Sequence, residues 1–450
     1  MVEILSFLFV VFFVVGLFYI NTKLDRAIEA RMGTPLERGE VAFPSFARTQ
    51  DPEGTLHAEL ADLLALRPDL KNTFAQGGLT GGGNVVGAGE RWRWAACRQR
   101  NVYAAALTAA LCRLCPDGLP DGEADFWQQG FLDLLDEGEG HFLLGLSYLR
   151  LYEPFHEEYA SVAEEAWLQA VAHFRHSAAA GHREGIDAAL LMAEIGHDLP
   201  FTPPAKLPEP LPSCSKKNGR NAEAMYWRYR AAEAGSIAAS ILGVQYLKQS
   251  RPDKARAERW LRQAMEHGDY MAARILFDKY RSGKFPDETE KNAALCMIFF
   301  ICQCGLLEFK RDITDAELVS AEEELELDAH VRRLIATHKT EGRELHARIM
   351  KDVYAKADAA AEQLERRLAQ AREKLPALCR KAEERQRKLL SAGAGDAAPA
   401  PCETTPQDTG KPRPAAPARN SAGPLAGKPA SRQPARKAEP RRSFARPDKR

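Results

Sequence analysis

Residues 227–246 read WRYRAAEAGSIAASILGVQY, and residues 260–280 read WLRQAMEHGDYMAARILFDKY. The two stretches align at a spacing of thirty-three residues, with tryptophan over tryptophan and Gly235 over Gly268. In each stretch apolar and small residues recur every three or four positions, which predicts a helix with one buried stripe. The glycine falls where that helix stops, as expected of a residue with positive φ after a helix. The pattern therefore predicts two helical hairpins of the same design.

Weaker copies of this unit flank the central pair. Residues 174–182 contain Ala-Ala-Ala-Gly-His and lead into a helical pattern over residues 188–195, while residues 140–148 resemble half a unit. Residues 293–305 repeat the outline, so Gly305 is expected to end a helix. A single hairpin cannot cover its own apolar face, so stacked copies would share a core. The alternative is an ordinary helical domain in which the Ala and Gly similarity is coincidental.

The two central stretches resemble the Sel-one-like repeat family, short helix-turn-helix relatives of the tetratricopeptide repeat. That family's pattern is an aromatic-led helix ending Ala-Ala-x-x-Gly, followed by Ala and then by Leu-Gly-x-x-Tyr. The resemblance extends over about residues 140–305, and the repeat domain is predicted over residues 140–310. It implies an all-α, tetratricopeptide-like α-solenoid that binds other proteins, without catalysis and without a cofactor.

This chain departs from the family's pattern in three places. The unit containing Gly243 is one residue short between Ala and Leu, and Phe277 stands where the Leu-Gly pair would have its glycine. A proline-rich insertion over residues 199–220 separates two units where the family would have a short loop.

A repeat surface would recognise a protein partner through side chains on one face of the stacked helices, with tyrosine and arginine as anchors. Arg228, Tyr246, Arg262 and Tyr280 are the candidate partner-binding residues. The two tyrosines also fall on positions that the family's pattern makes structural.

The first residues of the chain predict a transmembrane anchor over residues 1–22. Residues 4–20 read ILSFLFVVFFVVGLFYI without a charge, and a helix of that length spans about 25 Å. No basic residue precedes the stretch and no small-x-small cleavage site follows it, which disfavours a cleaved signal. Lys23, Arg26 and Arg31 follow directly, so the positive-inside rule predicts a single-pass plasma (inner) membrane protein with its C-terminal bulk in the cytoplasm.

Charge is segregated along the chain although its total cancels, with 62 Lys and Arg against 62 Asp and Glu. Residues 392–450 hold 12 basic and 5 acidic residues, about +7. Proline and alanine dominate this tail, which predicts disorder because it has too little apolar area to bury. Its charge could bind anionic lipid or nucleic acid, and a merely solubilising tail is the alternative.

The remaining segments connect these parts. Residues 23–54 read as a juxtamembrane linker and residues 55–139 as a helical N-terminal cap, with helices expected over 55–66, 91–114 and 125–135. Residues 311–391 read as charged helices.

A seam of apolar residues within these charged helices repeats every seven positions, which is typical of a coiled coil and predicts a homo-oligomer through residues 350–378. Pro376 near its end weakens this interpretation. A long amphipathic helix that packs back on the repeats is the equal alternative.

No complete catalytic signature occurs, and the cysteines and histidines are weak candidates for chemistry. Nine cysteines without framework spacing suit a reducing compartment. Cys112 and Cys115 have the spacing of half a zinc site, but no second pair follows. His173, His176 and His182 cluster without a carboxylate tied to them by spacing. We therefore expect no enzyme, no metal site and no cofactor.

A basic-aromatic run, Arg-Trp-Arg-Trp over residues 91–94, holds the ingredients of base stacking combined with phosphate contacts. A structural role, with tryptophan buried and arginine pointing outward, is the favoured interpretation.

Overall fold

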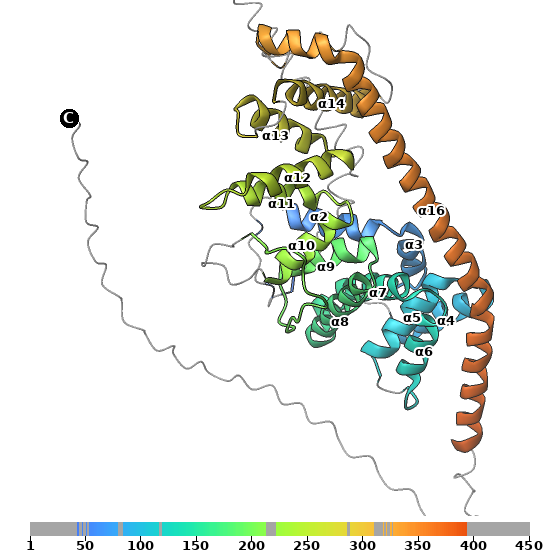
Figure 1. The fold of residues 1–450 in the computed structure, drawn as a ribbon. Coiled ribbons are helices and arrows are strands. Elements are labelled where there is room, and N and C mark those ends of the chain that lie inside the picture. Colours follow the sequence, from blue (N-terminus) through green and yellow to red (C-terminus); the bar gives the residue numbers. More distant parts are fainter. Residues whose placement is uncertain are drawn as a thin grey trace, which may run out of the picture. The chain divides into compact units, whose positions relative to one another are not determined.

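The computed structural model describes residues 43–44, 47, 51, 54–79, 84–116, 119–212, 222–285, 289–309, 318, 321, 325 and 327–393. Every regular element in these residues is a helix, so the all-α class is confirmed (Figure 1). The described helices are α2 (Thr55–Ala65), α3 (Pro68–Gln76), α4 (Val85–Gln99), α5 (Val102–Leu114), α6 (Glu123–Leu132), α7 (Glu137–Glu158), α8 (Ala160–Ala179), α9 (Arg183–Ile195), α10 (Ala222–Glu233), α11 (Ala238–Leu247), α12 (Lys254–Glu266), α13 (Tyr270–Arg281), α14 (Thr289–Phe309) and α16 (Ala329–Gly393).

The predictions for the two ends of the chain lie outside the described residues. This holds for the anchor at 1–22, for most of the linker at 23–54 and for the tail from residue 394 onward. Within the part of the chain that is described, no helix combines the length and the apolar character that a membrane span requires.

The N-terminal helices begin and end largely where the sequence predicts. Helix α2 stops before Pro68, which opens α3 at a position where its missing N–H costs nothing. The run predicted over 91–114 is wrong as one continuous element, because it forms α4 and α5 with a break between them. Arg100 takes a left-handed backbone (φ 54°) and the Asn101 side chain accepts from Tyr103 N and Ala104 N, which caps α5.

The turns of three hairpins have the same geometry. Gly181, Gly235 and Gly268 follow α8, α10 and α12 with φ of 82°, 83° and 91°, as predicted for residues just beyond a helix. After each glycine the next N–H donates to the carbonyl five residues earlier, at 3.0 Å from Ser236 to Ala231. The prediction for Gly305 is wrong, since it lies inside α14, which continues to Phe309.

Trp227 and Trp260 occupy matching settings, which supports the alignment of their two stretches. Each lies on the first helix of its hairpin, is almost fully buried, and donates its indole N–H to a glutamate. Ala231, Ala232 and Ala264 are fully buried, as close helix packing requires. From α7 to α14 each helix packs on the next one along the chain.

Helix α16 is one continuous element of 65 residues that packs on this array at two separate places (Figure 1). Its N-terminal half lies on α14, where His346 Nε2 is 3.1 Å from Gln303 Oε1 and Lys291 pairs with Glu341 at 2.7 Å. Its C-terminal half lies against α4 and α5, where it buries Leu375. All ten residues from 354 to 363 between these halves are exposed.

The structure favours a long helix that packs on its own chain, as the second interpretation of the heptad seam predicted, but the buried part of the seam lies against α4 and α5 in the predicted N-terminal cap. Leu368, Ala371, Leu375 and Leu378 are buried within this chain's own core, whereas Tyr354 is 58% exposed. Helix α16 runs through Pro376 without ending. The homo-oligomer through residues 350–378 stays a prediction, and only the exposed part of the seam is open to it.

Candidate protein-interaction surface

The described part of the proline-rich insertion, residues 199–212, lies across the repeat helices without forming a helix itself. Leu207, Glu209 and Leu211 are half-buried, while Pro208 and Pro210 between them are exposed. An extended chain points successive side chains to opposite sides, and proline favours that backbone. Over residues 207–211 the segment therefore turns every second side chain toward the helices.

Glu209 is the polar centre of this contact. Its Oε1 accepts from Arg259 Nη2 at 2.6 Å and from the indole Nε1 of Trp260 at 3.2 Å, and its Oε2 accepts from Arg256 Nε at 3.2 Å. The Glu209 side chain is 12% exposed, but those of Arg256 and Arg259 are 36% and 54% exposed. Two cations and one indole therefore hold a single carboxylate at the edge of the core.

Aromatic side chains of the helices contribute to the same contact. Tyr246 donates its hydroxyl to the carbonyl of Pro210 at 3.0 Å, and burial, followed by the charge of Glu209, raises its pKa to about 12. The guanidinium of Arg259 lies 4.9 Å above the Trp260 ring. Tyr229 meets that ring edge-on at 5.3 Å, so rigid rings line this part of the surface.

The start of the insertion is held in a related way. Arg175 of α8 donates to the carbonyl of Pro200 at 2.9 Å and binds both carboxylate oxygens of Glu223, at 2.7 and 2.6 Å. Glu223 also accepts from the Trp227 indole at 3.1 Å. Phe201 packs against Trp227 and lies under the Arg175 guanidinium. An arginine, a glutamate and a tryptophan thus recur at both ends of the segment.

The four predicted partner-binding residues are mostly engaged within the chain. Arg228 is buried and donates to Glu194, and Tyr246 contacts the insertion as described above. Tyr280 is buried and donates to Glu258, which Arg262 also binds at 3.1 Å. Their contact with a partner stays a prediction, and the burial of Arg228, Tyr246 and Tyr280 indicates mainly structural roles.

Glu209, Arg256 and Arg259 are not among the candidate residues predicted from the sequence. Glu209 is the one acidic residue of the segment 199–212, and it stands in the run Leu-Pro-Glu-Pro-Leu. That alternation was the available signal, because it predicts an extended chain with two leucines and one carboxylate on the same side.

The histidines that lie together in the structure differ from the predicted set. His141 joins it, with Nδ1 2.7 Å from Nδ1 of His173, and the ring of His176 stacks on His141 at 4.9 Å. Burial, together with the neighbouring histidines, lowers the pKa of His173 to about 3, so this ring is neutral at pH 7. His182 lies elsewhere and contacts Glu139.

Glu139, His182 and Glu184 place three potential metal ligands close together. Arg67 already occupies this group, since its Nη2 lies 2.6 Å from Glu184 and 3.3 Å from both oxygens of Glu139. His182 contacts Glu139 at 2.8 Å. The cluster is therefore an ion network that ties the corner between α2 and α3 to α7 and α9.

The predicted structural role of the basic-aromatic run, residues 91–94, agrees with the structure in part. Trp92 is buried and donates to the carbonyl of Thr73, whereas Trp94 is 57% exposed. Arg91 donates to the carbonyl of Gly77 at 3.0 Å.

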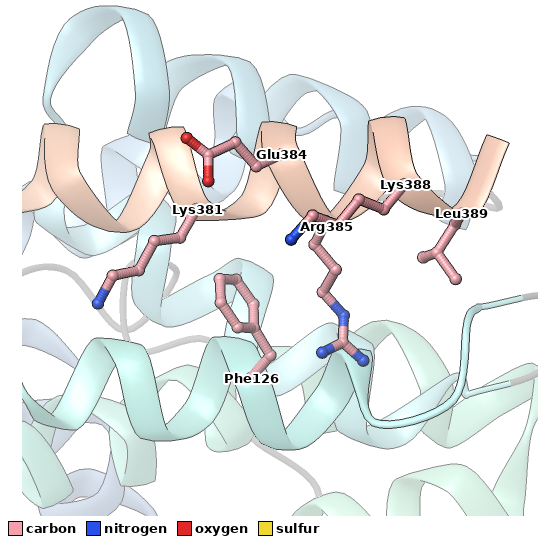
Figure 2. A pocket seen from close by; sticks show the side chains of 6 residues that line it. All are labelled: Phe126, Lys381, Glu384, Arg385, Lys388 and Leu389. Atoms are coloured by element: carbon pink, nitrogen blue, oxygen red, sulfur yellow. The ribbon is translucent and has the colours of Figure 1, made fainter. Parts of the chain in front are cut away.

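A shallow pocket of about 580 Å³ lies between α6 and the end of α16 (Figure 2). Arg385 lies over the Phe126 ring at 5.6 Å and pairs with Glu123, which also accepts from the Trp127 indole at 2.9 Å. The residues that line this pocket are Phe126, Lys381, Glu384, Arg385, Lys388 and Leu389. Basic side chains dominate the rim, but no group in this set is arranged as a nucleophile beside a base.

Comparisons with protein-family models, with curated proteins and with solved structures found no significant match to this chain. The resemblance to the Sel-one-like repeat family therefore stays an expectation drawn from the sequence pattern.

Proposed function

We propose that this chain is a scaffold without catalytic activity, whose helical repeats bind extended segments of partner proteins. The proposal treats hairpins α8–α9, α10–α11 and α12–α13 as units of a tetratricopeptide-like α-solenoid. The observation that carries it is the non-helical segment 199–212, which these helices hold through Glu209 and its two leucines.

The contact chemistry suits recognition of an extended chain. Tryptophan, tyrosine and arginine are the side chains that contribute most at protein interfaces, and here they surround one carboxylate and one backbone carbonyl. A proline-containing segment loses little conformational entropy when it binds. A partner segment with a carboxylate between two apolar residues matches the same surface.

The proposal also places this scaffold at a membrane. That part rests on the uncharged residues 4–20 and on the basic residues that follow them, which together predict a single anchor with the repeats in the cytoplasm. The anchor would confine the bound partner to the membrane surface.

Site-directed photo-crosslinking of the full chain in its native membranes tests the proposal. A photoreactive residue at Lys206, exposed beside Leu207, should capture a reproducible set of proteins. The same residue at Glu362, exposed in the middle of α16, is the matched control. Equal recovery from both positions, or no recovery from Lys206, would contradict the proposal.

The tail supports a second candidate, a membrane-held tether for anionic lipid or nucleic acid. The observation in its favour is the excess of 12 basic over 5 acidic residues within 392–450. Binding should then weaken steeply with added salt and disappear when these residues are deleted. Binding that survives the deletion would argue against this candidate.

A further inference from the structure

Two thiols from distant parts of the sequence meet where the C-terminal half of α16 packs on the N-terminal helices. Cys97 lies near the end of α4, and Cys379 lies on the face of α16 that also buries Leu375 and Leu378. The two side chains form a hydrogen bond. Cys97 is half-buried and Cys379 is buried, so only the first is open to small solutes.

The surroundings give the two thiols different roles. The hydrogen bond from Cys379 lowers the pKa of Cys97, and the guanidinium groups of Arg93 and Arg98 act in the same direction against burial and Glu383. The same hydrogen bond, followed by burial, raises the pKa of Cys379. Cys97, which is half-exposed and lies near two guanidinium groups, is therefore the thiol that meets an oxidant first.

Three other cysteines of the described residues have a different environment. Burial raises the pKa of Cys112 and of Cys304 to about 11, and that of Cys296 to about 12. Such thiols carry almost no thiolate at neutral pH and react slowly with oxidants.

We propose that Cys97 and Cys379 form a disulfide when the protein meets a peroxide, and that this bond fixes the C-terminal half of α16 to α4. The Cys97 thiolate attacks one peroxide oxygen, the O–O bond breaks, and a sulfenic acid and one water (after protonation) result. The Cys379 thiol then attacks the Cys97 sulfur, the S–O bond breaks, and a second water leaves. Two sulfurs are oxidised by one electron each, and the peroxide accepts both electrons.

Bond formation requires the two hydrogen-bonded sulfurs to approach to about 2 Å. In the reduced state this half of α16 is held by apolar packing and by ion pairs such as Arg367 to Asp136 at 2.8 Å. The disulfide adds a covalent link to that interface. A disulfide that forms transiently under oxidation is compatible with a reducing compartment.

The test treats the purified full chain with hydrogen peroxide, blocks free thiols with N-ethylmaleimide and analyses a tryptic digest by mass spectrometry. The expected product is a peptide pair joined through Cys97 and Cys379, lighter by two hydrogen atoms and separated by dithiothreitol. Hydrogen exchange over residues 364–385 should become at least several-fold slower on oxidation and recover on reduction. Cys97→Ser and Cys379→Ser should each abolish both effects, whereas the double variant C112S/C115S should keep them.

Three results would overturn the proposal. They are a Cys97 that stays unmodified, a Cys97 that proceeds to sulfinic acid without linking, and a Cys97 that links to a different cysteine. Circular dichroism checks that each serine variant folds. If Cys379→Ser does not fold, the half-exposed Cys97→Ser variant carries the comparison.

Discussion

The indole Nε1 of Trp260 donates to Oε1 of Glu209 at 3.2 Å, across a separation of 51 residues. Trp227 makes the equivalent bond to Glu223 at 3.1 Å, only four residues away on its own helix. In both places an arginine completes the arrangement by binding the same carboxylate. Both tryptophans therefore donate to a glutamate, and the proline-rich insertion supplies one of the two.

Glu209→Gln should weaken the insertion's attachment. The amide loses the charge that Arg256 and Arg259 bind, while the Trp260 bond can persist. Because both arginines are partly exposed, we expect a loss of about 1 kcal/mol in the free energy of unfolding. Urea denaturation measures it, and hydrogen exchange over residues 199–212 should become faster.

Glu362→Gln is the matched control for this change, because the Glu362 side chain is 76% exposed and its ion pair with Arg366 is long, at 3.8 Å. It should leave the free energy of unfolding nearly unchanged. Equal effects of the two variants would show that the Glu209 contacts contribute nothing specific.

Gly243→Ala should destabilise the contact between α11 and α12. A methyl group on Gly243 would lie 2.8 Å from Cγ of Leu261 and 3.1 Å from the carbonyl oxygen of Ala257, and backbone cannot easily move away. Overpacking of this kind costs about 1–3 kcal/mol, which offsets the gain in helix propensity of about 1 kcal/mol. Thermal and urea denaturation measure the balance.

Gly87→Ala in α4 gives the comparison, since its added methyl would meet side-chain atoms no closer than 3.4 Å. That variant should be neutral or stabilising by up to about 1 kcal/mol. If both alanines stabilise the protein, the close approach at Gly243 is not present in solution.

Stability should fall as the pH drops below about 6.5, because burial lowers the pKa of His173 to about 3. Between these two pH values the unfolded chain binds a proton that the folded chain excludes. The expected loss is up to about 1.4 kcal/mol per pH unit. Urea denaturation at pH 7.5, 6.5, 5.5 and 5.0 measures the slope.

His173→Gln should reduce that slope, whereas His330→Gln, on an exposed histidine of α16, should not. Because all measurements are made at pH 5 or above, protonation of Glu139 does not contribute to the slope. Burial of Glu139 is outweighed by its bonds to His182 and Arg67, which lower its pKa, so its contribution is lost only at more acidic pH. An unchanged slope in His173→Gln would contradict the prediction.

The exposed stretch 354–363 of α16 should exchange its amide hydrogens faster than the docked residues 368–379. Its helical hydrogen bonds have no tertiary packing to protect them, so local opening there costs less. Hydrogen exchange followed by mass spectrometry measures this. Ala360→Gly should increase the exchange further, with little change over 368–379. Uniform protection would instead show that this stretch is covered, as a homo-oligomer through residues 350–378 predicts.

Local features of the fold could be predicted because their causes are local. The glycine turns after α8, α10 and α12 follow from helix termination, and the end of α2 follows from Pro68. The break between α4 and α5 could have been found from Asn101, a strong helix-capping residue. Gly305 was misread because a glycine inside a long buried helix has the same sequence outline as one at its end.

The candidate surface could not be predicted from the sequence, because its residues come from separate elements. Glu209 gains its role from α12, and His173 is neutral because it is buried and lies beside His141 on another helix. Cys97 and Cys379 become a pair only where α16 returns to the N-terminal helices.

The sequence by itself determined the helical class, the repeated hairpin and its glycine turns, since backbone preferences and the spacing of apolar residues act over a few positions. Only the tertiary structure decided which face of α16 is buried and where the proline-rich insertion lies. The apolar residues of the heptad seam could pack equally well on a second chain or on this chain's own core. Leu375 and Leu378 are buried in this chain's own core. The hydrophobic effect is non-directional, so the sequence pattern does not specify which surface an apolar face meets. Long-range packing decides it.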